Sequence, residues 1–322
     1  MQLSVIVCTK NRAHILVGCL DSIARAFANA SPLEAEIVVV DNASSDDTSA
    51  VVEKWAATCA CPVRLLYEPG RGIALGRNRG MGEARGRLLA FTDDDCRLAP
   101  DYVVDLLAHF QSDTVPTLRG GRVELGDPRD LPMTIKTDNQ AADYAHPMHP
   151  AGFIHGANMA MPRTVVDRVG LFDPRFGAGT NFPGEDCDYI IRAHAAGIRV
   201  QYVPDMVILH FHGRRDKATA QRLFAGYMRA NGALYIKHLR SSPLLIRHLW
   251  WDIRHWYREW RYGTPKFLGE ADIGHRQIVL GNLLGMLQFT MLLLRAYCLT
   301  LFRLRGAAQE PATLPAEDLP LQ

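Results

Sequence analysis

Three consecutive aspartates, Asp93, Asp94 and Asp95, follow the apolar run 88–92 in this chain of 322 residues. Capping a helix needs one carboxylate, and three adjacent negative charges repel one another unless a cation or hydrogen bonds compensate them. Carboxylate oxygens are the ligands that Mg²⁺ and Mn²⁺ take in proteins, and these ions also bridge to phosphate groups. The run therefore predicts a divalent metal site for a phosphate-bearing substrate rather than a solvated acidic loop.

Apolar runs that are rich in β-branched residues alternate with helical patterns through the first 110 residues. We expect strands at 3–7, 36–40, 63–67 and 88–92, and helices at about 15–27, 44–55, 73–84 and 100–110. Strands and helices in this alternation form right-handed βαβ units. The sequence therefore predicts a Rossmann-like α/β fold with a mostly parallel sheet and helices on both faces. Ligands of such folds bind beyond the carboxyl ends of the strands, where the aspartates lie.

Other polar residues also stand near these strand ends. Thr9, Asn11 and Arg12 follow the first strand, and Asp41 follows the second. An aspartate after a strand often only caps a helix, but its carboxylate can also accept an N–H group from a nucleobase edge. Arg77 lies in the helix before the acidic strand end, where it could reach a nucleotide or the acidic cluster. A plain surface arginine is equally consistent with the pattern.

A second acidic segment, GEDCDY at 184–189, stands at the start of a predicted helix. Carboxylates interact well with the dipole at a helix N-terminus, which explains one or two of these acids. Further along, His210 and His212 follow an expected strand at 200–209. Being two residues apart, they would face the same way on a strand. One of them could complete a metal site, and the alternative is a structural histidine on an exposed loop.

Several motifs occur in the order found in family 2 glycosyltransferases of the GT-A fold. The N-terminal motifs are SVIVCTKNR (4–12), VVVDNASSDDT (38–48), GRNRG (76–80) and FTDDDC (91–96). The later motifs are GANMAMPRTVVDRVGLFDPRFGAG (156–179), GEDCDYIIRAHAAGIRVQYVP (184–204) and VILHFHG (207–213). The chain resembles this family, in its bacterial cell-surface polysaccharide type, over about residues 3–215.

The resemblance implies a site for a nucleoside-diphosphate sugar, with UDP, dTDP or GDP as the nucleotide. The implied nucleotide-sugar-binding residues are Thr9, Asn11, Arg12, Asp41, Arg77, Asp93 and Asp94. The implied metal ligands are Asp93, Asp95, His210 and His212. The aspartate run leaves open whether Asp94 or Asp95 is the main ligand. The implied cofactor is Mn²⁺ or Mg²⁺, which would neutralise the diphosphate.

The resemblance also implies a reaction. Asp186 is the expected catalytic base that removes the proton of the acceptor hydroxyl, and Glu185 is expected to position hydroxyl groups of the donor or acceptor. A base of this kind must be ionised and lie within about 3 Å of the hydroxyl. Direct in-line attack inverts the anomeric centre, the usual outcome in this family. Two other functions stay open: a non-catalytic sugar-nucleotide-binding or assembly module, and a nucleotidyltransferase.

The formal net charge of +2 argues against nucleic-acid binding through bulk charge, yet the charges are segregated along the chain. Residues 1–209 contain 20 basic and 26 acidic residues, whereas residues 210–306 contain 16 basic and 5 acidic ones. Within the basic part, LWWDIRHWYREWRYG (249–263) interleaves Trp and Tyr with Arg, a composition typical of membrane interfaces. The apolar run 278–294 follows, at the lower limit of length for a membrane span.

This apolar run leaves three arrangements open: a helix in the plane of a membrane or re-entering it, a helix buried against the catalytic domain or a partner subunit, and a true span. Arg295, Arg303 and Arg305 would contact anionic headgroups on the cytoplasmic side.

We expect a peripheral or monotopic protein at the cytoplasmic face of the cell membrane, with the cytoplasm as the alternative. The first residues lead into an apolar strand without a basic segment or a small-residue cleavage site, so we expect no cleaved signal peptide. The expected acceptor is a lipid-linked glycan or a polysaccharide, and the C-terminal helices could form a homo-oligomer.

The predicted domain organisation has three parts. Residues 1–215 form a GT-A domain, with a nucleotide-sugar-binding half (1–110) and an acceptor half (111–215). A basic, aromatic and apolar helical segment that associates with a membrane is expected over 216–306. The Pro-containing tail 307–322 is expected to be disordered.

Overall fold

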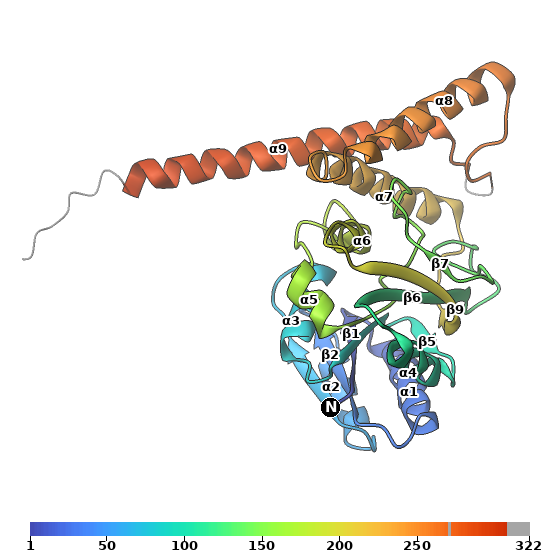
Figure 1. Ribbon diagram of the computed structural model, residues 1–322, viewed down its shortest axis with the longest axis vertical. Helices are drawn as coiled ribbons and strands as arrows, with labels where there is room; N and C mark the ends of the chain where they lie inside the picture. Colours follow the sequence, from blue (N-terminus) through green and yellow to red (C-terminus); the bar gives the residue numbers. More distant parts are fainter. Residues whose placement is uncertain (270–271, 308–322) are drawn as a thin grey trace, which may run out of the picture.

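A nine-stranded sheet forms the centre of the protein in the computed structural model, which describes residues 1–269 and 272–307 (Figure 1). The strands are β1 (Leu3–Thr9), β2 (Ala35–Asp41), β3 (Val63–Tyr67), β4 (Leu88–Asp93), β5 (Cys96–Leu98), β6 (Thr117–Leu125), β7 (Ala142–Asp143), β8 (Asn158–Pro162) and β9 (Arg199–His210). Their order in the sheet is β3-β2-β1-β4-β8-β6-β9-β5, and β7 pairs with β9.

Helices cover both faces of this sheet. They are α1 (Ala13–Asn29), α2 (Thr48–Ala56), α3 (Ile73–Glu83), α4 (Tyr102–Ser112), α5 (Arg163–Val169), α6 (Glu185–Ala195), α7 (Lys217–Lys237), α8 (Arg247–Tyr262) and α9 (His275–Ala307), with a 3₁₀ turn at Pro243–Ile246. Apolar residues of α1, α2 and α4 pack on one face, and those of α3, α5 and α6 pack on the other. This arrangement confirms the predicted α/β fold.

The four strands β3, β2, β1 and β4 are parallel, as their continuous apolar sequences predict for strands buried on both faces. Their register aligns the polar strand ends: Thr9 lies opposite Asp41, and Cys8 lies opposite Asp93. The polar residues that follow these strands are therefore collected at one edge of the sheet. This is the edge at which the sequence predicted a ligand.

The other half of the sheet is mixed in direction, and of its five strands only β9 was expected from the sequence. β8 lies antiparallel between β4 and β6, and β9 runs parallel to β6. The short strand β5 pairs antiparallel with the end of β9, so that Cys96 lies opposite His210. This pairing brings the end of the aspartate run to the histidine motif.

The predicted helix at 44–55 begins later than expected, at Thr48. The residues before it form a turn, in which the backbone N–H of Ser44 donates to Asp41 Oδ1 at 2.8 Å. Asp46 Oδ1 accepts the N–H of Thr48 at 3.1 Å. Side chains of this kind satisfy backbone donors in turns, and they compete with helix formation there.

The C-terminal helices form a layer against α6, beyond one side of the sheet (Figure 1). Helices α7 and α9 pack backbone to backbone, since a Cβ on Gly232 would overlap the carbonyl oxygen of Asn282. A Cβ on Gly285 would likewise overlap the carbonyl oxygen of Arg229. The first half of α9 is thus partly buried against α7. This agrees with one of the three arrangements left open by the sequence, a helix packed against the rest of the protein. The range 291–300 is exposed, and α9 projects past the body.

Within the described part of the chain, α9 is long and apolar enough over His275–Thr300 to cross a membrane by length and composition. Of the 18-residue window that meets this criterion, 28% is buried inside the protein. The predicted tail at 307–322 lies outside the described residues, except for Ala307 at the end of α9.

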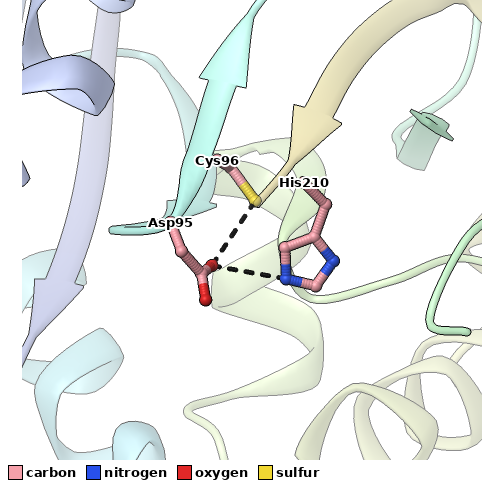
Figure 2. Close-up of side chains that lie close together, drawn as sticks. All are labelled: Asp95, Cys96 and His210. Carbon is pink, nitrogen blue, oxygen red and sulfur yellow. Dashed lines mark hydrogen bonds and ion pairs between the residues drawn. The ribbon is translucent and has the colours of Figure 1, made fainter. Parts of the chain in front are cut away.

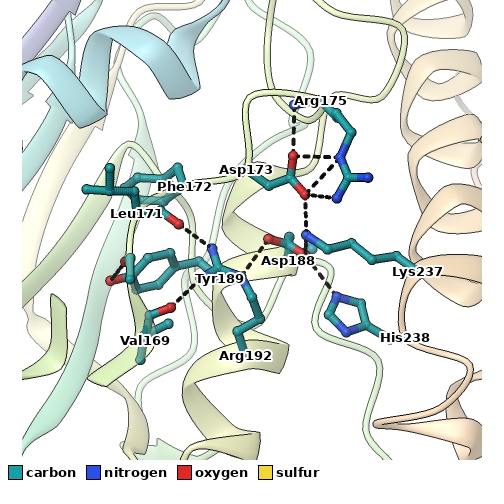
Figure 3. Close-up of polar contacts among 12 residues, drawn as sticks. Val169, Leu171, Phe172, Asp173, Arg175, Asp188, Tyr189, Arg192, Lys237 and His238 are labelled. Atoms are coloured by element: carbon teal, nitrogen blue, oxygen red, sulfur yellow. Dashed lines mark hydrogen bonds and ion pairs between the residues drawn. The ribbon is translucent and has the colours of Figure 1, made fainter. Parts of the chain in front are cut away.

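A buried carboxylate joins α6 to the C-terminal helices (Figure 3). Asp188 Oδ1 accepts hydrogen bonds from Lys237 Nζ at 2.6 Å and from His238 Nε2 at 2.8 Å. Asp188 Oδ2 accepts one from Arg192 Nε at 2.9 Å. Burial alone would raise the pKa of Asp188, but these three partners outweigh it and lower the pKa to about 2. The charged form of Asp188 therefore stabilises this junction.

Replacing this carboxylate should destabilise the protein at neutral pH. We expect Asp188→Asn to lower the free energy of unfolding by about 3 kcal/mol, because Arg192 loses its carboxylate partner and Lys237 is left with Asp173 alone of its two carboxylates. Because the pKa of Asp188 is depressed on folding, its contribution is present above about pH 4 and is lost as the pH falls towards 2. Urea titrations at pH 7 and pH 3 should therefore show a smaller difference between the two proteins at pH 3.

Asp167→Asn is the matched control, because Asp167 is exposed on α5. Its effect should stay within about 0.5 kcal/mol at both pH values. Equal unfolding free energies for Asp188→Asn and Asp167→Asn at pH 7 would contradict the stabilising role of this junction.

Candidate active site

A cavity of about 1160 Å³ opens at the carboxyl edge of the parallel strands. Ligand pockets usually measure about 300–1,000 Å³, so this cavity has room for two substrates side by side. Of the residues predicted to form the site, those that line it are Thr9, Arg12, Arg77, Asp93, Asp94, Asp95, Glu185, Asp186 and His210. The fold therefore brings together residues that are up to about 200 positions apart in the chain.

The clearest metal-binding geometry joins Asp95 to His210 (Figure 2). Asp95 Oδ1 lies 3.3 Å from His210 Nε2, and both side chains are buried. Burial alone would raise the pKa of Asp95 and lower that of His210, but their mutual interaction reverses both shifts. The pairing of β5 with β9 produces this contact, because it places the residue after Asp95 opposite His210.

Cys96 completes a group whose possible ligand atoms lie within 4.8 Å of one another. Its Sγ atom lies 3.9 Å from Asp95 Oδ1 (Figure 2). Burial raises the pKa of the Cys96 thiol strongly, so the thiol stays protonated and is a poor ligand. A carboxylate with an imidazole suits Mn²⁺ better than Mg²⁺, which prefers oxygen ligands alone. The donor set therefore fits the predicted divalent ion.

The other two aspartates of the run have different surroundings. Asp93 Oδ1 accepts a hydrogen bond from Arg77 Nη2 at 3.2 Å. Asp94 is buried, and this burial raises the pKa of Asp94 to about 7. Of Asp94 and Asp95, which the sequence left open as main metal ligand, only Asp95 faces His210 within the described cluster.

His212 does not join this cluster in the described structure. The strand β9 ends at His210, so alternation along a strand does not extend to His212. Its Nε2 donates to the carbonyl oxygen of Leu131 at 3.1 Å, and its Nδ1 accepts the N–H of Arg214 at 3.0 Å. Both ring nitrogens are used in holding loops together. This matches the alternative of a structural histidine, in a buried rather than exposed position.

A buried arginine links the two acidic segments. Arg77 Nη1 donates to Glu185 Oε1 at 2.6 Å, while Nη2 of the same guanidinium contacts Asp93. Burial raises the pKa of Glu185 to about 6, although Arg77 opposes this shift. Arg77 therefore reaches the acidic cluster, one of the three positions considered for it.

Asp186 presents its carboxylate to the cavity from the first turn of α6. Its Oδ2 accepts one hydrogen bond, from the backbone N–H of Gly156 at 3.1 Å. Gly156 belongs to the loop before β8, so the acceptor-side motif holds the carboxylate in place. This arrangement leaves an acidic group beside the metal cluster without an arginine bound to it.

Asp41 has both carboxylate oxygens occupied. Oδ1 accepts the N–H of Ser44 at 2.8 Å, and Oδ2 accepts the hydroxyl of Ser49 at 2.6 Å. The next residue, Asn42, lines the cavity, whereas Asp41 is not among the lining residues. Asp41 thus shapes the loop after β2 in this structure.

Asn11 also stabilises a loop and does not line the cavity. It takes a left-handed backbone conformation with φ 54°, and its Oδ1 accepts the N–H of Ser45 at 2.7 Å. This hydrogen bond ties the loop after β1 to the loop after β2. Thr9 and Arg12, on either side of Asn11, do line the cavity.

Two cavity residues, Arg214 and His155, were missed in the sequence. Arg214 Nη1 and His155 Nε2 are buried atoms without a hydrogen-bond partner among the described residues. The neighbouring Arg215 instead pairs with Asp127 at 2.9 Å and with Asp130 at 3.0 Å. Arg214 directly follows the histidine motif and His155 directly precedes the segment at 156–179, so adjacency to a motif was the available signal.

Two family profiles match the chain: "Glycosyl transferase family 2" over residues 4–170, and "Glycosyl transferase family group 2" over residues 88–306. Validoxylamine A glucosyltransferase of Streptomyces hygroscopicus subsp. limoneus is 26% identical over 280 residues, which cover 78% of this chain and 59% of that protein. Pre-mycofactocin glycosyltransferase of Mycobacterium tuberculosis (strain CDC 1551 / Oshkosh) is 24% identical over 196 residues, covering 58% and 40%. The chain thus spans about half the length of these relatives.

Solved structures show the same fold. S. aureus TarS 1-349 in complex with UDP-GlcNAc gives a TM-score of 0.55 at 18% identity, covering 80% of each chain. The mannosyltransferase PcManGT from Pyrobaculum calidifontis, in complex with GDP-Man and Mn²⁺, gives a TM-score of 0.55 at 20% identity, covering 93% of this chain and 80% of that one. With the family match over more than half of its length, the chain belongs to glycosyl transferase family 2, and it has the GT-A fold of these structures.

Proposed function

We propose that this glycosyltransferase moves a sugar from a UDP-, dTDP- or GDP-sugar to an acceptor hydroxyl, with a divalent metal and with inversion at the anomeric carbon. One observation carries the proposal: a single cavity contains both the Asp95–His210 pair and the carboxylate of Asp186. A metal bound to the pair would supply positive charge for the diphosphate leaving group. The relatives in complex with UDP-GlcNAc and GDP-Man support the choice of donor class.

The protein groups suffice for a direct displacement. The oxygen of the acceptor hydroxyl forms a bond to the anomeric carbon. Asp186 takes the proton of this hydroxyl as the bond forms. The bond from this carbon to the diphosphate oxygen breaks on the opposite face, which inverts the centre. The guanidinium of Arg214 faces the same cavity and offers a hydrogen-bond donor to the departing phosphate.

Cysteine chemistry does not offer a competing covalent route. Cys8 and Cys187 line the cavity, but burial raises the pKa of Cys8 to about 12 and that of Cys187 strongly as well. Neither thiol is ionised near neutral pH, so neither is a good nucleophile. This favours a single displacement over a glycosyl-cysteine intermediate.

Removal of the proposed base tests the reaction. With a panel of UDP-, dTDP- and GDP-sugars in Mn²⁺, Mg²⁺ or EDTA, we expect transfer from one donor that EDTA abolishes. Asp186→Asn should lower kcat by at least about 100-fold, the contribution usual for a general base, while nucleotide affinity stays unchanged. Calorimetry with the free nucleotide and chromatography of the product measure the two effects. Full transfer by Asp186→Asn, or full transfer in EDTA, would overturn the mechanism.

The two histidines of the motif allow a matched test of the metal site. His210→Ala should weaken Mn²⁺ binding by more than about tenfold, a loss that even outer-shell partners of a metal can cause. His212→Ala should leave Mn²⁺ affinity unchanged, although it lowers the melting temperature because the Leu131 carbonyl loses its donor. Calorimetry with Mn²⁺ below the melting temperatures checks both. Equal Mn²⁺ affinities of the two variants would contradict the assignment.

We also propose that the protein acts at the cytoplasmic face of a membrane on a lipid-linked glycan or polysaccharide. Support comes from α9, whose exposed apolar residues recur on one helix face. They are Leu280, Leu283, Leu284, Leu287, Met291 and Leu294. On α8, Trp250, Tyr257 and Trp260 are exposed beside arginines, a composition suited to a headgroup layer.

Vesicle flotation tests this placement. The full chain should float with vesicles of phosphatidylcholine and phosphatidylglycerol, whereas a Leu284→Glu, Leu287→Glu variant should stay at the bottom because two charges enter the apolar face. Val104→Glu with Val115→Glu adds the same charges at exposed positions of the catalytic part and should still float. A wild-type chain that stays at the bottom of the gradient would disprove membrane binding through α9.

A further inference from the structure

The cavity continues from the metal pair to a second region between α7, α8 and the loop before β8. This region, the distal arm, is lined by Tyr235, His149, His248, Trp251 and Asp252. The ring of His149 lies 6.0 Å from that of Tyr235 and 5.0 Å from that of His248, and both contacts are edge-on. The three segments of the chain thus meet in one aromatic cluster. The sequence had singled out Trp251 and Asp252 only as part of 249–263, with the composition of a membrane interface.

One face of α7 connects the distal arm to the catalytic carboxylate. Tyr227, Asn231 and Tyr235 all line the cavity at intervals of four residues. Burial and the charge of Asp186 raise the pKa of Tyr227, whereas burial and the charge of Asp252 raise the pKa of Tyr235. Tyr227 and Tyr235 stand about 12 Å apart along α7, and each is affected by a different carboxylate.

We propose that the distal arm binds the acceptor, and that the acceptor is a glycoside with an apolar aglycone. The inference rests on the proposed sugar transfer and deepens it. Aromatic rings beside a few polar groups form the kind of pocket that orients a small polar ligand. Here the rings of Tyr235 and Trp251 can stack on the C–H face of a sugar, and Asp252 can accept its hydroxyl groups. The wall that α7 forms between Tyr235 and Tyr227 is about 12 Å long, which is longer than one sugar ring.

The apolar aglycone is inferred from the mouth of the arm. Trp251 and Phe267 line the cavity and are also 47% and 55% exposed, so they form its rim. Leu268 and Ile278 continue the lining towards α9. Asp252 Oδ2 accepts a hydrogen bond from Asn282 Nδ2 at 3.3 Å, which ties the arm to the helix with the exposed apolar face. An apolar aglycone that extends out of the distal arm at this point would lie on an apolar protein surface.

Binding of simple glycosides tests the assignment without knowledge of the natural acceptor. The probes are octyl and methyl glycosides of glucose, mannose and N-acetylglucosamine, below the critical micelle concentration, in calorimetric titrations with UDP or GDP and Mn²⁺ present. At least one octyl glycoside should bind about tenfold more tightly than its methyl counterpart. Trp251→Ala should remove this advantage, since truncating an aromatic side chain that contacts the ligand often costs about tenfold. Trp251→Phe, which keeps a ring, should restore most of it.

Two controls separate the arm from the protein surface. Trp250→Ala removes the neighbouring indole, which is exposed and does not line the cavity, and it should not change octyl glycoside binding. The Leu284→Glu, Leu287→Glu variant should also keep it, because those side chains belong to the exposed face of α9. Absence of saturable octyl glycoside binding, or equal effects of Trp251→Ala and Trp250→Ala, would overturn the inference.

The nucleotide titrations distinguish this failure from failure of the proposed function. If UDP and GDP bind and a donor is hydrolysed, but the octyl glycosides do not bind, the distal arm alone is wrongly assigned. If no nucleotide binds and no nucleotide sugar is hydrolysed, the proposed function fails and the inference fails with it.

Discussion

The buried guanidinium of Arg77 is the contact on which the rest of the site depends. It contacts Asp93 at the end of β4 and Glu185 at the start of α6, and Glu185 lies 108 positions after Arg77 in the sequence. Taking an arginine and carboxylates out of water is costly, and loss of one partner leaves the others as uncompensated buried charges. The backbone makes room for the guanidinium, since a Cβ on Gly156 would lie 2.6 Å from Arg77 Nη1. One side chain thus links the strand end that carries the three aspartates to the helix that carries Glu185 and Asp186.

This constraint also explains why Asp186 and Glu185 differ, although they are neighbours. Glu185 faces inwards and is satisfied by Arg77, whereas Asp186 is held by a backbone N–H and keeps its place at the cavity. The same contrast recurs where Arg215 is bound by aspartates and Arg214 turns to the cavity. In both cases two neighbouring residues of similar type differ in their partners. One of the two forms ion pairs within the protein, and the other keeps polar atoms available to a ligand in the cavity.

The sequence predicted the parallel strands well because each is a continuous apolar run, and their polar ends marked the edge that carries the cavity. It did not predict β5, a strand of three residues whose existence depends on pairing with β9. Without that pairing, neither the choice between Asp94 and Asp95 nor the difference between His210 and His212 was accessible. The distal arm was hidden for a related reason: its rings come from a loop and two helices that meet only in the folded chain.

The close contact between α7 and α9 has a mechanical consequence. Gly232 and Gly285 bring the backbones of α7 and α9 into direct contact, with no side chain of these two residues between them. We therefore expect the two helices to move together. The opposite side of α7 carries the cavity face from Tyr227 to Tyr235, and its end is clamped to α6 through Lys237. A force on the protruding half of α9 would therefore be transmitted through α7 to the wall of the cavity.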